Sequence, residues 1–124
     1  MHMLPQTAGA SPRIVVADDD DLLSEVLVSA LRTHRHYAVH APGGILTPDL
    51  VANAGLVILD AHIPGVDFRT TLRTIRDAGA EVLVLSGEPT PPLDVPAERY
   101  LAKPVDLVVL LDAVSRLTNS GSAA

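Results

Sequence analysis

The run Leu56-Val57-Ile58-Leu59 places four apolar residues in a row and leads directly into a carboxylate, Asp60. A short apolar run between turn-forming residues is typical of a strand that is buried on both faces. Pro64-Gly65 then turns the chain before a helical pattern begins. Asp60 is therefore predicted to lie where a buried parallel strand ends, at the sheet edge where ligands commonly bind.

Four more stretches have the character of strands and alternate with helical patterns. Buried strands are predicted at 14–17 and 81–85, a short alternating edge strand at 36–41, and a short last strand at 100–102. Strands that alternate with helices indicate an α/β protein, in which a parallel sheet lies between two helical layers as a three-layer αβα sandwich.

Apolar residues at helical spacing predict helices in the segments between and after these strands. Helices are expected from Asp21 to Thr33, from Pro48 to Ala54, from Val66 to Ala78 and from Val105 to Leu117. The segment 87–99 holds four prolines within eight residues, so it excludes a long regular helix.

Composition limits the kinds of function. With 124 residues the chain suits one domain, and an aromatic share of only 2% requires an aliphatic core. A net charge of −6 argues against direct binding of nucleic acid, because phosphate contacts need clustered Lys and Arg. There is no cysteine, no apolar run as long as a membrane span, and no secretory signal pattern, so we expect a cytoplasmic protein without a membrane association.

The tail from Thr118 to Ala124 is small and polar. We expect a disordered N-terminal segment at 1–12, the folded domain at 13–117, and a flexible tail or the start of a linker at 118–124.

Four of the predicted strands end in a reactive side chain. The first ends at Asp18 and Asp19, the third at Asp60, the fourth at Ser86, and the fifth just before Lys103. Because the carboxyl ends of parallel strands lie at one edge, these side chains are expected to converge. The second strand contributes no comparable group.

The chemistry of such a cluster is restricted. Carboxylates close together repel one another, and an oxygen-only cluster suits a hard divalent cation such as Mg²⁺. A carboxylate nucleophile, a divalent cation, a lysine and a serine hydroxyl can together stabilise a phosphoryl group during transfer.

Four segments carry a family resemblance, namely RIVVADDDDLL, LVILDAHIPGVDF, VLVLSG and YLAKPVD. In order and spacing over about 13–117, the chain resembles bacterial response-regulator receiver domains of the CheY-like kind. The resemblance implies a five-stranded sheet of order 2-1-3-4-5, the flavodoxin/CheY-like arrangement. The prolines predict that the fourth helix of that fold is short or absent.

The resemblance also implies a role for each reactive residue. Asp60 would accept a phosphoryl group as an aspartyl phosphate, and Lys103 would pair with a phosphoryl oxygen. Mg²⁺ would be held by Asp19, by Asp60 and by the backbone carbonyl of His62, with Asp18 binding it through a water. No other cofactor is implied.

Two further residues would form a switch. Ser86 would hydrogen-bond the phosphoryl group, and the ring of Tyr100 would turn inward when Ser86 moves. The peptide bond between Lys103 and Pro104 is predicted to be cis, as the family usually has it.

The implied partners are a sensor histidine kinase or phosphotransfer protein in a phosphorelay, and an output domain or partner protein. The chain would catalyse only its own phosphorylation and dephosphorylation, so it would not be an enzyme in the conventional sense. The apolar run Val105–Leu111 could also mark the face of a homodimer.

Two alternatives stay open. A phosphatase of the haloacid-dehalogenase type would use Asp18 as nucleophile together with Asp20, Ser86 and Lys103, although the chain lacks the further acidic motif of that family. A receiver-like interaction module that is never phosphorylated is the second. Asp20 and Asp21 themselves are better explained as acidic residues at a helix N-terminus.

Overall fold

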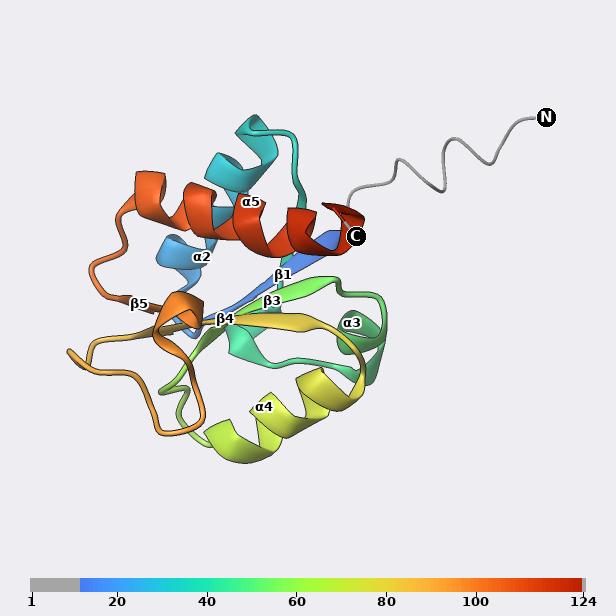
Figure 1. The fold of residues 1–124 in the computed structure, drawn as a ribbon. Helices are drawn as coiled ribbons and strands as arrows, with labels where there is room; N and C mark the ends of the chain where they lie inside the picture. Colours follow the sequence, from blue (N-terminus) through green and yellow to red (C-terminus); the bar gives the residue numbers. More distant parts are fainter. Residues whose placement is uncertain (1–11, 124) are drawn as a thin grey trace.

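The sheet contains five parallel strands in the order β2-β1-β3-β4-β5. The computed structural model describes residues 12–123 and the side chains of residues 12–119 (Figure 1). The predicted sandwich and strand order are thus confirmed. The strands are β1 Arg13–Ala17, β2 Tyr37–His40, β3 Leu56–Asp60, β4 Glu81–Ser86 and β5 Tyr100–Ala102.

Helices cover both faces of the sheet (Figure 1). On one face lie α2 (Asp21–Thr33) and α5 (Leu107–Ala123), and on the other lie α3 (Pro48–Ala52) and α4 (Phe68–Asp77). Two 3-10 turns, η1 (Pro42–Gly44) and η2 (Ala97–Arg99), complete the described elements.

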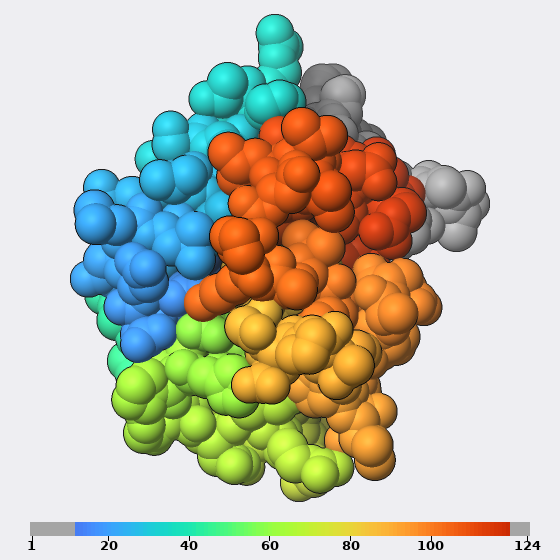
Figure 2. Space-filling model, turned by 90° about the vertical axis from the view of Figure 1, so that its left-hand side faces the viewer, coloured from blue at the N-terminus to red at the C-terminus, as the bar shows by residue number. Residues whose placement is uncertain are grey.

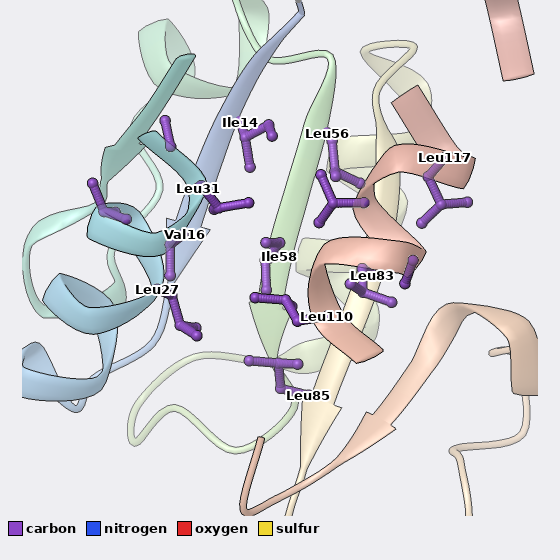
Figure 3. Packing of buried hydrophobic residues seen from close by; sticks show 14 residues of the cluster. Ile14, Val16, Leu27, Leu31, Leu56, Ile58, Leu83, Leu85, Leu110 and Leu117 are labelled. Atoms are coloured by element: carbon purple, nitrogen blue, oxygen red, sulfur yellow. The ribbon is translucent and has the colours of Figure 1, made fainter. Parts of the chain in front are cut away.

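Alternation along the strands divides the core into two clusters. Ile14 and Val16 of β1 pack with the cluster under α2 and α5, whereas Val15 and Ala17 pack with the cluster that α4 covers. Figure 3 shows the first cluster, in which Leu110 of α5 lies against strand residues. Because both faces are covered, the central strands read as continuous apolar runs.

Side-chain caps determine where the helices begin. Asp20 accepts from Leu23 N at 3.1 Å, and Asp67 accepts from Thr70 N at 3.0 Å. The Asp67 cap makes α4 begin at Phe68, two residues later than the apolar pattern suggested.

The proline-rich segment forms no α-helix between β4 and β5, as predicted. It is attached to α4 instead: Asp94 Oδ2 lies 2.6 Å from Arg69 Nη2, and Arg76 Nη2 donates to Asp94 O at 3.1 Å. The neighbouring Val95 is buried in the core that α4 covers. The segment is therefore held in place without an α-helix of its own.

Helix α5 runs to Ala123, beyond the expected helix end at Leu117. Thr118 Oγ1 donates to Val114 O at 2.8 Å, so its hydroxyl is satisfied within the helix. The domain division at residue 117 stays a prediction, and residues 1–11 of the expected N-terminal segment lie outside the described part of the chain. Among the described helices, none combines the length and apolarity needed to cross a bilayer.

The core packing predicts a large loss of stability in Leu83→Ala. Leu83 is fully buried in β4, so truncation should lower the free energy of unfolding by about 2–5 kcal/mol. Urea denaturation followed by circular dichroism measures it. Val108→Ala is the control, because Val108 is 77% exposed and its truncation should have little effect. Equal losses in the two variants would contradict the assigned core.

Candidate functional site

Residues from four separate stretches meet at one edge of the sheet. Asp18 directly follows β1, Asp60 is the last residue of β3, Ser86 is the last residue of β4, and Lys103 directly follows β5. These four strands are consecutive neighbours in the sheet. Figure 2 views the molecule from this side, where the blue, green, yellow-orange and orange-red parts of the chain adjoin. The convergence expected from the sequence is present.

Three carboxylates form a compact cluster at this edge. One oxygen from each of Asp18, Asp19 and Asp60 lies within 4.8 Å of the others. Asp18 and Asp60 are buried, whereas Asp19 is exposed and opens the cluster to solvent. An all-oxygen donor set with one open side fits a hard divalent cation that retains water ligands.

The ammonium group of Lys103 lies against two of these carboxylates. Lys103 Nζ is 2.9 Å from Asp18 Oδ2 and 3.4 Å from Asp60 Oδ2. The contact with Asp18 is an ion pair without the alignment of a hydrogen bond, since Asp18 Oδ2 has no hydrogen-bond partner among the described residues. One positive charge therefore faces two buried negative charges.

The other oxygen of each buried acid is held by the loop that follows it. Asp20 N donates to Asp18 Oδ1 at 2.9 Å, and His62 N donates to Asp60 Oδ1 at 3.1 Å. Both are local turns in which the carboxylate accepts from the amide two residues ahead. The two Oδ2 atoms are thereby directed to the same place, the Lys103 ammonium.

Ser86 and Tyr100 both hydrogen-bond to the backbone of Glu88. Ser86 Oγ accepts from Glu88 N at 3.1 Å, and Tyr100 OH donates to Glu88 O. Lys103 N also donates to Ser86 O at 2.8 Å, which ties the end of β5 to the end of β4. The serine, the tyrosine and the lysine are therefore connected through hydrogen bonds to the backbone of Glu88 and Ser86.

The remaining predicted site features are placed as follows. The His62 side chain is exposed, and the role of its carbonyl stays a prediction. The bond between Lys103 and Pro104 is cis, as predicted. Asp20 caps α2 and Asp21 lies in its first turn, which confirms their helix-terminal role.

Two residues near the cluster were not singled out from the sequence. Ser24 is fully buried in α2, and its Oγ donates to Asp18 O at 3.3 Å. Gly44 in η1 lies beside the peptide that joins Asp18 to Asp19. The sequence signal at Gly44 was only a Pro-Gly-Gly turn, which does not say what the turn contacts.

Burial raises the pKa of the Asp60 carboxyl above its usual value, and the Asp18 charge adds to this rise. The His62 hydrogen bond and Lys103 oppose it without cancelling it. Burial also acts to lower the pKa of Lys103, but its close ion pairs with Asp18 and Asp60 outweigh burial and raise that pKa. Lys103 thus stays charged at neutral pH, and the ionised Asp60 is held in an unfavourable setting.

This arrangement predicts that Asp60→Asn is more stable than wild type at pH 7. Because the pKa of Asp60 is higher in the folded than in the unfolded state, its ionisation costs stability at pH values above both. The advantage of the variant should shrink as the pH falls through the raised pKa of Asp60, and it should be gone below the ordinary aspartate pKa. Urea denaturation at several pH values, without divalent cations, measures it.

Asp67→Asn is the matched control for this measurement. Hydrogen bonds from Thr70 lower the pKa of Asp67, so its ionised form stabilises the fold at neutral pH and the same substitution should act in the opposite direction. A stability loss in Asp60→Asn at pH 7 would contradict the assigned electrostatics.

Comparisons with known proteins agree with this geometry. No model of a known protein family matches the chain. The response regulator MprA of Mycobacterium sp. strain KMS is 34% identical over 108 residues, which cover 80% of this chain and 47% of that protein. Protein RcaC of Microchaete diplosiphon is 28% identical over 119 residues, or 89% of this chain and 18% of RcaC. The chain thus spans about half or less of the length of these curated relatives.

Solved structures show the same similarity. The signal receiver domain of an HD domain-containing protein from Pseudomonas fluorescens Pf-5 is 26% identical, with a TM-score of 0.77 and coverage of 93% of this chain and 100% of that one. The receiver domain of the hybrid histidine kinase CckA is 25% identical, with a TM-score of 0.67 and coverage of 86% and 98%. Together with the parallel sheet of order 2-1-3-4-5, these similarities identify the chain as a response-regulator receiver domain of the CheY-like kind.

Proposed function

We propose that Asp60 accepts a phosphoryl group from a sensor histidine kinase or phosphotransfer protein, and that this modification changes the interactions of the domain. The observation that carries the proposal is the position of Asp60 at the centre of the edge. Asp18 and Asp19 lie on one side of it and the Lys103 ammonium lies 3.4 Å from its Oδ2.

The transfer step uses groups of this chain in defined roles. A carboxylate oxygen of Asp60 forms the bond to phosphorus while the bond from phosphorus to the donor imidazole nitrogen breaks. Lys103 pairs with an oxygen of the arriving phosphoryl group, and the Ser86 hydroxyl donates to another. Water then attacks the phosphorus and returns Asp60 to its carboxylate.

The residues present fit a magnesium ion. Asp19, Asp60 and the carbonyl of His62 would bind it directly, and Asp18 would bind it through a water. When bound, the cation supplies the charge neutralisation that lets an anionic phosphoryl group approach anionic Asp60. Lys103 alone cannot neutralise the negative charge of the cluster, since its single positive charge faces two buried carboxylates.

The switch would act through the backbone of Glu88. If the Ser86 hydroxyl turns toward a phosphoryl group, it leaves the amide of Glu88, and the carbonyl of the same residue is the acceptor of Tyr100 OH. The tyrosine ring and the segment after β4 then lose their resting arrangement, and the populations of two states shift.

The phosphatase alternative is less compatible with the contacts. Its nucleophile would be Asp18, whose contacts with Asp20 N and Lys103 match those of Asp60 with His62 N and Lys103 and do not separate the two functions. Its second acid would be Asp20, which instead caps α2. A module that is not phosphorylated is left as an outcome of the first experiment below.

The kinase, the output and the cytoplasmic location stay predictions. A homodimer also stays a prediction; Val108 and Val109 at the start of α5 are exposed and would supply apolar surface for it. The only reaction proposed for the chain is its own phosphorylation and dephosphorylation.

Intact-protein mass spectrometry after incubation with acetyl phosphate and Mg²⁺ tests the acceptor. Wild type should gain the mass of one phosphoryl group, and Asp60→Asn should gain none, because the amide lacks a nucleophilic oxygen. Asp20→Asn is the control and should be labelled like wild type, since the side chain of Asp20 caps α2 and its backbone bond to Asp18 is kept in the variant.

Labelling of Asp60→Asn would refute Asp60 as acceptor. If, in addition, the single variants Asp18→Asn and Asp20→Asn both failed to be labelled, the result would point to the phosphatase. An unlabelled wild type that also fails to respond to beryllofluoride would identify the domain as an interaction module.

A second measurement tests the switch. The amide resonance of Glu88 should move when Mg²⁺ and beryllofluoride are added to wild type, because Ser86 Oγ is its hydrogen-bond acceptor. In Ser86→Ala the movement should be much smaller, whereas the exposed Ser29→Ala should respond like wild type. An undiminished response in Ser86→Ala would rule out coupling through this hydroxyl.

A further inference from the structure

We propose that Gly44 is a positioning residue for the metal site: by having no side chain, it allows the peptide that joins Asp18 to Asp19 to occupy the position needed for cation binding. This inference rests on the proposed function of the acidic cluster. Gly44 ends η1, the turn after edge strand β2, and none of the acidic residues comes from that connection.

The contacts of Gly44 show what a side chain would displace. A Cβ at this position would lie 3.1 Å from Asp18 C and 3.1 Å from Asp19 N, the two atoms of the bond that joins these residues. It would also lie 3.0 Å from Ile63 Cδ1. Real Cβ atoms rarely approach this closely, and a backbone cannot rotate away as the end of a side chain can.

The turn that carries Gly44 is itself anchored. Ala41 N donates to Val16 O at 2.9 Å, and Gly44 N donates to Ala41 O at 2.9 Å. Gly44 is buried. Because these bonds attach the turn to β1, an added methyl group cannot be relieved by a free outward movement of the turn.

Gly44 therefore contacts both loops that carry metal-binding acids. The Asp18–Asp19 peptide ends β1, and Ile63 lies three residues after Asp60 in the loop that follows β3. Magnesium requires near-ideal octahedral geometry, so a small displacement of one carboxylate against another weakens binding. Changes just outside a ligand set typically cost about 10–100-fold in metal affinity.

Two other glycines separate this effect from backbone strain. Gly44 has φ +79°, Gly43 has φ +63° and Gly79 has φ +87°, so alanine is strained at all three positions. A Cβ at Gly43 would meet only Ile45 Cγ1 at 3.9 Å, and one at Gly79 would meet nothing within 4 Å. Gly43→Ala is thus a control in the same turn, and Gly79→Ala is a control at the end of α4.

Isothermal titration calorimetry with MgCl₂ on wild type and the three alanine variants tests the proposal. All three variants should unfold at lower temperature than wild type, because all carry the strain. Only Gly44→Ala should lose Mg²⁺ affinity, by about tenfold or more. Trimethylamine N-oxide stabilises compact states and is added to every sample, so that a marginal variant is titrated in its folded form.

Each outcome has a definite meaning. Gly44→Ala binding Mg²⁺ as tightly as Gly43→Ala and Gly79→Ala, or an equal affinity loss in all three, would overturn the positioning role and leave the proposed function intact. Wild type that binds no Mg²⁺ would refute the proposed metal site and this inference with it.

Discussion

The contact of the Lys103 ammonium with Asp18 and Asp60 is the interaction on which the site depends. Buried carboxylates are costly unless they are paired, and here one cation serves two of them at 2.9 Å and 3.4 Å. The pairing is incomplete, because two buried negative charges face a single positive one and Asp19 adds a third nearby. This uncompensated charge, open to solvent at Asp19, suits the edge to the divalent cation that we propose, and the cation in turn would attract a phosphoryl group.

The parallel sheet makes this contact possible. Each reactive residue stands at the end of its own strand, and β1, β3, β4 and β5 are consecutive neighbours. The edge strand β2 contributes no residue to the acidic cluster, but the turn that follows it lies close to the Asp18–Asp19 peptide at Gly44. The site thus depends on a residue with no chemistry of its own.

The segment after β4 departs most from the usual receiver arrangement. Its prolines exclude a helix, and Asp94 holds it against Arg69 and Arg76 of α4. Ser86 and Tyr100 nevertheless both bond to the backbone of Glu88, which is the connection that the proposed switch would use. The surface between β4 and β5 is the part that differs, because here it consists of a loop that is held by α4.

The sequence by itself determined the strands, their alternation with helices and the order of the reactive residues, because these depend on local periodicity and on turn-forming residues next to them. It also identified Asp20 as a helix-terminal residue, since capping involves only the following turn. Helix ends were less predictable: α4 begins at the Asp67 cap, and α5 continues beyond Leu117.

Only the tertiary structure decided which atoms meet. That Lys103 contacts both buried acids, that Asp94 attaches to α4, and that Gly44 lies against the Asp18–Asp19 peptide depends on strand register and on packing between residues far apart in the chain. Such contacts leave no periodic pattern in the sequence, because each depends on the three-dimensional placement of segments whose local structure is the same whether or not they touch.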